Sequence, residues 1–167
     1  MSDSDVDAFW QDAKVRAGLN AAPGYLGVNS VEALAPPAWC LGGTDQQADD
    51  LAALVASGVK TGTAGALWDY EAAGEELPRV GALGIVCDSR GRPVALVQTT
   101  SVRVVAFNQV DAEHAASEGE GDLSLEYWRR VHQAFFTEFA EHDRGFAPHM
   151  PVVLERFDVL YVADRPA

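Results

Sequence analysis

The sequence has little cysteine, no long apolar run and few basic residues. Its two cysteines, Cys40 and Cys87, do not form a C-x-x-C pair. A disulfide framework and a cysteine zinc site are therefore excluded, and we expect both thiols to be reduced and buried. The acidic residues lack the spacing of a calcium loop, so we expect neither a metal nor a cofactor.

Signals for membranes and export are missing as well. No apolar run approaches the roughly 18 residues of a membrane span. The first five residues include two aspartates and lack the basic start and apolar stretch of a secretory signal. The sequence therefore predicts a cytoplasmic protein with no membrane partner, and it leaves the oligomeric state open.

Positive charge is scarce, because 12 lysines and arginines stand against 25 acidic residues, for a net charge of −13. Affinity for long nucleic acid comes largely from basic side chains that neutralise phosphates. This balance argues against a general RNA binder and against double-stranded DNA as a partner, and it allows a small ligand. A local basic patch stays open, either at 129–130 or among Arg90, Arg92 and Arg103.

The 167 residues, 48% of them hydrophobic, predict one folded domain. Helical periodicity covers residues 4–17, the stretch from a capping box at Thr44 to Gly58, and residues from 124 onward. Strand-like runs cover 61–68, 82–87, 93–107 and 152–162, with hairpin turn residues at 88–91. An irregular connection at 18–43, an acidic bend at 69–76 and a short helix capped by Asp111 complete the pattern. We expect an α+β domain whose sheet curls into a small barrel.

Two short segments carry the chemistry-bearing residues. The first contains Lys60, one of only two lysines, and Thr63, while the second, residues 118–122, alternates carboxylates with glycines. Each segment also has an ordinary structural interpretation. Lysine beside a glycine is common where a helix ends, and Glu118 and Asp122 are positioned to cap helices.

The order of these motifs resembles the ASCH domain family (activating signal cointegrator homology). The residues that carry the resemblance are Gly58-x-Lys60-x-x-Thr63, then 118–122, then the pattern L-x-x-W-R-x-x-H-x-x-F-F at 125–136. The match runs from about residue 39 to residue 161. It implies a PUA-like small mixed β-barrel flanked by helices at 39–167, with an N-terminal helix and connection at 1–38 packed on the domain.

The resemblance also implies a function. Small bacterial relatives include an amidohydrolase of acetylated cytidine that uses a lysine, a threonine and a glutamate, which fall on Lys60, Thr63 and Glu118. The predicted activity is hydrolysis of acylated nucleosides or related amides. The alternatives are an RNA- or nucleotide-binding module and a single-strand ribonuclease using the same cleft, so the expected partner is a modified nucleoside or single-stranded RNA. The family often has alanine in place of Gly62 and a serine or arginine shortly after the threonine, whereas here 64–66 are Ala-Gly-Ala.

Further residues are predicted to contact the substrate: Gly58, Glu120, Tyr127, Trp128, Arg129 and His132. Trp128 and Tyr127 are candidates for stacking on a base, or they are simply a core residue and a rim residue. His132 lies on the apolar face of its helix, where a histidine of the core is the alternative to a catalytic one.

Two mechanisms fit the predicted catalytic set. In one, Thr63 attacks the acyl carbon, Lys60 accepts its proton, and Glu118 positions the lysine or relays a proton to the leaving amine. In the other, Glu118 activates water and a cationic Lys60 stabilises the oxyanion. Burial lowers the pKa of a lysine and a neighbouring carboxylate raises it, so the sequence does not choose between them. Both mechanisms require the three side chains to share one cleft.

Overall fold

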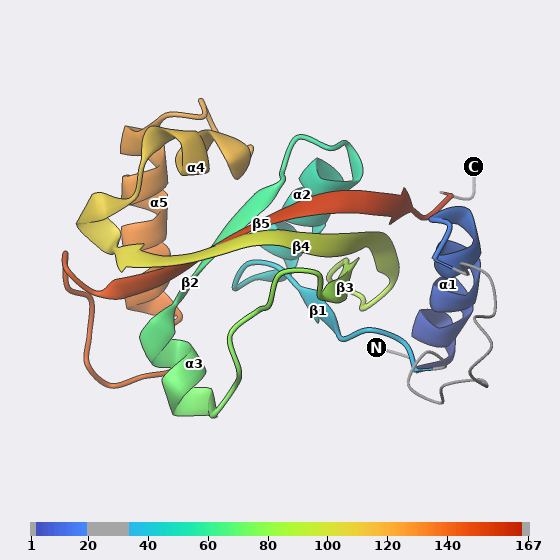
Figure 1. The fold of residues 1–167 in the computed structure, drawn as a ribbon. Coiled ribbons are helices and arrows are strands. Elements are labelled where there is room, and N and C mark those ends of the chain that lie inside the picture. The colour runs from blue at the N-terminus through green and yellow to red at the C-terminus, as the bar shows by residue number, and fades with distance from the viewer. Residues whose placement is uncertain (1–2, 20–33, 165–167) are drawn as a thin grey trace. The chain divides into compact units, whose positions relative to one another are not determined.

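The computed structural model describes residues 3–19 and 34–164, and Figure 1 shows the fold. The elements, in chain order, are α1 (Asp3–Arg16), β1 (Ala38–Cys40), α2 (Asp45–Ala56), β2 (Gly62–Ala66), α3 (Leu67–Ala73), β3 (Leu83–Cys87), β4 (Pro93–Ala106), the 3-10 helix η2 (Phe107–Gln109), α4 (Ala112–Ser117), α5 (Leu125–Glu138) and β5 (Pro151–Val162). Within the described ranges, none of the helices combines the length and apolar character needed to cross a membrane.

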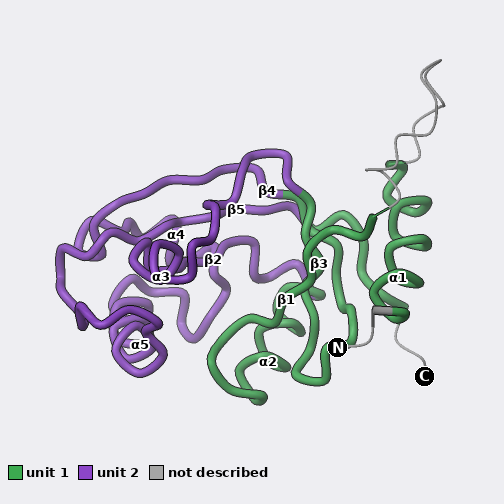
Figure 2. The backbone as a smooth tube through the Cα atoms, turned by 90° about the horizontal axis from the view of Figure 1, so that it is seen from below, with its two compact units in different colours: residues 1–56, 83–98, 159–167 green, residues 57–82, 99–158 purple. Residues whose placement is uncertain are grey.

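The chain divides into two compact units, coloured separately in Figure 2. Unit 1 comprises residues 1–56, 83–98 and 159–167, and unit 2 comprises 57–82 and 99–158. The long strands β4 and β5 contribute one end to each unit. This division is interleaved along the sequence, and the boundary expected at residue 38 stays a prediction.

The five strands follow the order β1-β3-β4-β5-β2. In unit 1, β1 runs parallel to β3, which is antiparallel to β4. In unit 2, β2 is antiparallel to β5, with Gly62 opposite Arg156 and Ala66 opposite Val152. Among the described residues β1 and β2 form the two edges and do not pair with each other, so the sheet is open and the predicted closed barrel is not confirmed. The fold is mixed α+β.

Unit 1 has its own apolar core, in which α1 takes part through Val6, Trp10 and Ala13. These residues recur at helical spacing, and they pack with Ile85 and Leu96. The prediction of a first amphipathic helix is confirmed. Trp39, on β1, lies so close to Gly84 that a side chain at this glycine would overlap its indole ring.

The two cysteines lie opposite each other on β1 and β3. Both are free; Cys87 is buried, as expected, whereas Cys40 is exposed. The prediction was wrong for Cys40 because β1 is an edge strand. Burial raises the pKa of the Cys87 thiol to about 11, which leaves it protonated and unreactive at neutral pH.

The core of unit 2 lies between its strands and α5. On α5 the buried residues Trp128, His132 and Phe136 are spaced four apart and form one stripe. Strand residues that include Ala66, Val152 and Leu154 complete this core. The helix begins after Ser124, whose hydroxyl accepts a hydrogen bond from the Tyr127 amide at 3.0 Å. Asp122, the cap that the sequence offered as a candidate, instead accepts a hydrogen bond from the Ser124 amide at 2.9 Å.

Most of the other elements match the predicted pattern. The hairpin between β3 and β4 is held by Asp88, whose carboxylate accepts hydrogen bonds from the Arg90 and Arg92 amides. The β3–β4 pairing has a register shift between Val86 and Cys87. Helix α3 was missed, since residues 69–76 were interpreted as an acidic bend, and so was the three-residue β1. Part of the predicted irregular connection at 18–43 lies outside the described residues.

Candidate functional site

Lys60 lies just before β2 and is 1% exposed. Its Nζ donates to Glu118 Oε2 and to Glu120 Oε1, both at 2.9 Å, and more weakly to the Glu118 carbonyl oxygen at 3.4 Å. Two carboxylates therefore enclose one ammonium group. The side chain of Glu118 is 2% exposed and that of Glu120 is 21% exposed, so the network reaches solvent on the Glu120 side.

The carboxylate of Glu118 is the centre of this network. Its Oε2 binds Lys60, while its Oε1 accepts from Trp128 Nε1 at 2.7 Å and lies 3.2 Å from His114 Nε2. His132 Nε2 is 3.5 Å from the same oxygen, and His132 Nδ1 donates to the Trp128 carbonyl oxygen at 3.0 Å. We call this network, formed by Lys60, His114, Glu118, Glu120, Trp128 and His132, the lysine cluster.

Local helix geometry assembles the cluster. The Asp111 carboxylate accepts a hydrogen bond from the His114 amide at 2.8 Å and starts α4, as predicted. His114 and Glu118 are then four residues apart at the end of α4, and Trp128 and His132 have the same spacing on α5, so each pair shares a helix face. The rings of Trp128 and His132 stack with centroids 4.1 Å apart.

Glycines allow the acidic segment to approach the start of β2. A Cβ at Gly119 would lie 2.7 Å from the Val59 carbonyl oxygen, and Gly119 has a φ of +74°. A Cβ at Gly62 would overlap the Ser117 hydroxyl. The Thr61 amide also donates to the Ser117 carbonyl oxygen at 2.8 Å. Backbone contact and the buried ion pair together fix α4 against β2.

Electrostatics keep the central pair charged. Burial alone would lower the pKa of Lys60, but Glu118 and Glu120 outweigh it and raise that pKa. Burial likewise opposes ionisation of Glu118, but the Lys60 ammonium and hydrogen bonds from His114 and His132 hold the pKa of this carboxyl well below its usual range. Lys60 is thus a cation at neutral pH and does not act as a base in this arrangement. Glu118 is a fully engaged anion.

Thr63 lies outside the lysine cluster. It is opposite Glu155 in the β2–β5 register, and among the described residues no hydrogen bond joins it to Lys60 or Glu118. Neighbouring strand residues alternate between faces, so Thr63 points away from the face on which Gly62 meets Ser117. The structure therefore brings together two members of the predicted catalytic set and leaves the third on the other face.

The face of Thr63 carries a different carboxyl group. Glu155 accepts a hydrogen bond from the Thr99 hydroxyl at 2.5 Å, and burial raises the pKa of Glu155. Burial also raises the pKa of Tyr70, whose ring lies next to Gly65. These groups are half-buried or buried and do not line the pocket described below.

Three of the predicted substrate-contacting residues also lie outside the cluster. Gly58 is exposed with a φ of +73°, which suits a helix end, and a Cβ there would meet nothing within 4 Å. Tyr127 is half-buried, with its ring next to Gly121 and the Arg130 guanidinium 5.1 Å from the ring centroid. Arg129 is exposed and donates to the Asn108 carbonyl oxygen at 3.3 Å.

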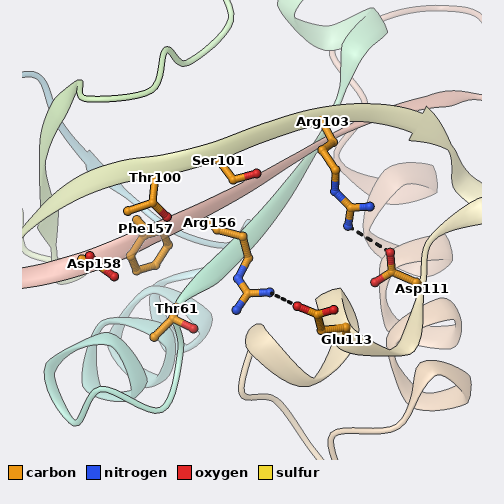
Figure 3. Close-up of a pocket in the computed structure, with 9 residues that line it drawn as sticks. All are labelled: Thr61, Thr100, Ser101, Arg103, Asp111, Glu113, Arg156, Phe157 and Asp158. Atoms are coloured by element: carbon orange, nitrogen blue, oxygen red, sulfur yellow. Dashed lines mark hydrogen bonds and ion pairs between the residues drawn. The ribbon is translucent and has the colours of Figure 1, made fainter.

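A pocket of about 410 Å³ in unit 2 was not predicted as a site (Figure 3). We call it the arginine pocket. Its lining residues come from the position just before β2, from β4, from β5 and from the start of α4: Thr61, Thr100, Ser101, Arg103, Asp111, Glu113, Arg156, Phe157 and Asp158. Three hydroxyls, two guanidiniums, three carboxylates and an aromatic ring thus face one hollow.

Both arginines of the pocket meet acidic residues at the start of α4. Arg103 Nη2 is 3.0 Å from Asp111 Oδ2, and Arg156 Nη1 is 3.6 Å from Glu113 Oε1 (Figure 3). Thr61 and Glu113 line the pocket, while their neighbours Lys60 and His114 belong to the lysine cluster. The sequence offered one signal for this pocket, the polar Thr-Thr-Ser stretch at 99–101 before Arg103.

The described part of the chain contains no group of three or more histidine, cysteine or acidic side chains placed to hold a metal ion. Most polar groups of the lysine cluster bind one another, whereas the arginine pocket is a hollow lined by charged and hydroxyl side chains.

The comparisons with known proteins agree with the motifs and the fold. The model of the ASCH domain matches residues 37–161. The crystal structure of an ASCH domain from Lactobacillus crispatus is similar, with 30% identity, a TM-score of 0.78 and 95% of each chain covered. Protein EF3133 from Enterococcus faecalis is 31% identical, with a TM-score of 0.76 over 93% of this chain and 88% of that one. No curated protein matches the chain. The match over most of the sequence shows that this chain belongs to the ASCH domain family.

Proposed function

We propose that the chain binds a small polar ligand, of nucleoside or nucleotide size, in the arginine pocket. The observation that carries this proposal is the pocket itself, which is about 410 Å³ and is lined by hydroxyls, guanidiniums, carboxylates and one aromatic ring. Ligand pockets of small molecules fall between about 300 and 1,000 Å³ and place a few polar groups around an apolar contact. A ribose and a base both offer hydrogen-bonding groups to such side chains, while Phe157, which is 4% exposed, forms a buried part of the wall.

Charge favours a small ligand over a long polynucleotide. Two arginines and three carboxylates line the pocket, and the whole chain carries −13 charges. A polynucleotide would meet repulsion beyond the few phosphates that two arginines can contact. The nucleotide-binding alternative of the family thus receives more support from this geometry than a general RNA-binding role.

Titration calorimetry with a panel of nucleosides and nucleotides tests this proposal. A Ser101→Phe variant fills the pocket from β4 and is expected to weaken binding at least about tenfold, since it removes the space that the ligand needs. A matched control is Val104→Phe, because Val104 is also on β4, is 46% exposed and does not line the pocket. Absence of binding to the whole panel, or equal binding by both variants, would contradict the proposal.

Hydrolysis of acylated nucleosides is the second candidate. It is favoured by the 2.9 Å contact between Lys60 and Glu118, which joins two residues of the set that the resemblance implies. With Lys60 held as a cation, the chemistry left to it is stabilisation of an oxyanion. Such a role requires the cluster to open, because Lys60 is 1% exposed and both its carboxylate partners are in place.

An assay of the deacetylation of acetylated cytidine, in which the acetate released is measured, tests this second candidate. Thr63→Val removes the hydroxyl of the predicted nucleophile at nearly constant volume, and Thr137→Val, at an exposed threonine of α5 outside both the cluster and the pocket, is the matched control. If Thr63 is the nucleophile, turnover is lost in Thr63→Val and kept in Thr137→Val. Full turnover in Thr63→Val would exclude the Lys-Thr-Glu mechanism.

A single-strand ribonuclease would need Lys60 to lie next to the RNA phosphate and to stabilise a phosphorane during cleavage. The two carboxylates that flank Nζ repel a phosphate, so this geometry gives the ribonuclease the least support of the three. Degradation of single-stranded RNA that is lost in Lys60→Arg, in a variant shown to be folded, would reverse this order.

A further inference from the structure

We propose that Arg103 and Arg156 form an anion subsite in the arginine pocket, which Asp111 and Glu113 occupy in the absence of ligand. The ligand would then carry a phosphate or carboxylate group. This inference rests on the proposed function, because it names a chemical group of the ligand that the same pocket takes. It assigns recognition to two arginines that belong to neither of the sequence motifs.

Arg156 has donor capacity that its partner does not use. A guanidinium has five N–H donors. The acidic partner of Arg156 is Glu113, at 3.6 Å, and the Glu113 side chain is 88% exposed. The Nε of Arg156 is buried and has no hydrogen-bond partner. A buried donor without an acceptor is costly, so an oxygen supplied by a ligand would relieve that cost.

Arg103 is also incompletely paired. It contacts one oxygen of Asp111, at 3.0 Å, while the other oxygen of Asp111 accepts the His114 amide at 2.8 Å. Asp111 therefore cannot form the two parallel hydrogen bonds that a guanidinium makes with a free carboxylate or phosphate. The side chains of Arg103 and Asp111 are 49% and 44% exposed, so solvent and a ligand both reach this pair.

A ligand anion has a clear advantage over the present partners. Exposed ion pairs such as Arg156–Glu113 contribute little to stability, because water screens them and the side chains lose freedom. A phosphate held by two guanidiniums makes several charge-assisted hydrogen bonds at once. The hydroxyls of Thr100 and Ser101, on the same wall as Arg103, supply further donors (Figure 3).

Glu113 then acts as an internal competitor for Arg156. It lies on α4 and points at the guanidinium, as Figure 3 shows. Its removal would free Arg156 for a ligand, whereas removal of Arg156 would leave the repulsion from Glu113 in place. The two substitutions are therefore expected to change affinity for anions in opposite directions.

Calorimetric titration with cytidine, cytidine 5′-monophosphate, inorganic phosphate and acetate tests the subsite. We expect the monophosphate to bind about tenfold or more tightly than cytidine, and Arg156→Gln or Arg103→Gln to abolish that difference. Glu113→Gln should tighten the monophosphate a few-fold and leave cytidine unchanged. Arg79→Gln is the control and should change nothing, because Arg79 is exposed, pairs with Glu76 and does not line the pocket. The phosphate and acetate titrations separate a preference for phosphate from one for carboxylate.

The outcomes separate this inference from the proposed function. Cytidine and its monophosphate binding equally well would overturn the subsite and leave the pocket proposal standing. A preference for the monophosphate that survives in Arg103→Gln and Arg156→Gln would also overturn it. Binding of phosphate or acetate that depends on both arginines, with no binding of either cytidine compound, would support the subsite and contradict the nucleoside-type ligand. No binding by any of the four compounds would overturn both.

Discussion

The lysine cluster and the arginine pocket are two charged regions of the same unit, and they differ in how well their charges are matched. In the cluster, Lys60 and Glu118 are each about 1% exposed, and their hydrogen bonds join several partners. In the pocket, Arg156 has one acidic contact at 3.6 Å and an unpaired Nε. The charged atoms of the cluster are all paired, although His114 Nδ1 is buried there without a hydrogen-bond partner. Paired charges in the core fix a structure, whereas a partly paired guanidinium at the surface leaves donors for a ligand.

The cluster should therefore be the region where a single substitution costs most. Lys60→Met removes the cation and leaves Glu118 charged in the core, so we expect a loss of about 3–5 kcal/mol in the free energy of unfolding. Denaturant titration measures it. The chain offers one other lysine as a control, because Lys14 is half-buried on α1 with its Nζ 5.6 Å from the Trp10 ring. Lys14→Met should cost less than about 1 kcal/mol; similar losses for the two variants would contradict the structural role of the cluster.

The two carboxylates of the cluster provide a second contrast. Glu118→Gln is expected to cost about 3 kcal/mol, because it leaves a buried ammonium with one carboxylate, and Glu120→Gln about 1 kcal/mol, because Glu120 is partly solvated. If Glu120 were the main partner of Lys60, Glu120→Gln would lower the free energy of unfolding by more than Glu118→Gln does.

The pH dependence of the same variants follows from the lowered pKa of Glu118. The folded protein keeps this carboxylate charged, while the unfolded chain binds a proton near the usual value of 4.5. Its stabilising contribution is therefore present above about pH 4.5 and is lost as the pH falls through the lower pKa of the folded state. We expect Glu118→Gln to show a shallower loss of stability in acid than the native chain does. Parallel acid-unfolding curves would contradict this.

The sequence predicted the cluster better than the pocket for a physical reason. Lys60 and Glu118 belong to two local motifs, and helix periodicity places Trp128 and His132 on one buried face. The arginine pocket depends on the registers of β2, β4 and β5, which decide the face on which each side chain stands. No local pattern links Arg103 with Arg156, and strand alternation also separated Thr63 from Lys60.

The fold shows the same contrast between elements that a local sequence pattern predicts and elements that it does not. The helices α1, α2 and α5 were predicted because each has apolar residues at helical spacing over several turns. Helix α3 has seven residues and no side-chain cap, and β1 has three residues, so neither provides enough pattern. Closure of the sheet was expected from the number of short strands and hairpin links as well as from the family, but no local pattern decides whether the edge strands meet, and the open strand order gives closure no support.

Two glycines allow a further comparison, with smaller expected effects, between a tightly packed position and an open one. Gly119 and Gly58 have φ angles of +74° and +73°, so alanine is strained to a similar degree at each. A Cβ at Gly119 would also collide with the Val59 backbone, whereas one at Gly58 meets nothing within 4 Å. We expect Gly58→Ala to cost about 1 kcal/mol and Gly119→Ala about 2 kcal/mol or more, measured by thermal unfolding. Equal costs would show that the acidic segment does not need its close approach to Val59.

The most direct test of the whole account is a nitrogen–proton spectrum recorded while cytidine 5′-monophosphate is added. The Nε–H signals of Arg103 and Arg156 report on the pocket, and the Nε1–H signal of Trp128, which donates to Glu118, reports on the cluster. We predict that both arginine signals shift in a saturable way while the Trp128 signal stays in place. A shift of the Trp128 signal with the arginine signals unchanged would contradict the account, because it would place the ligand at the lysine cluster.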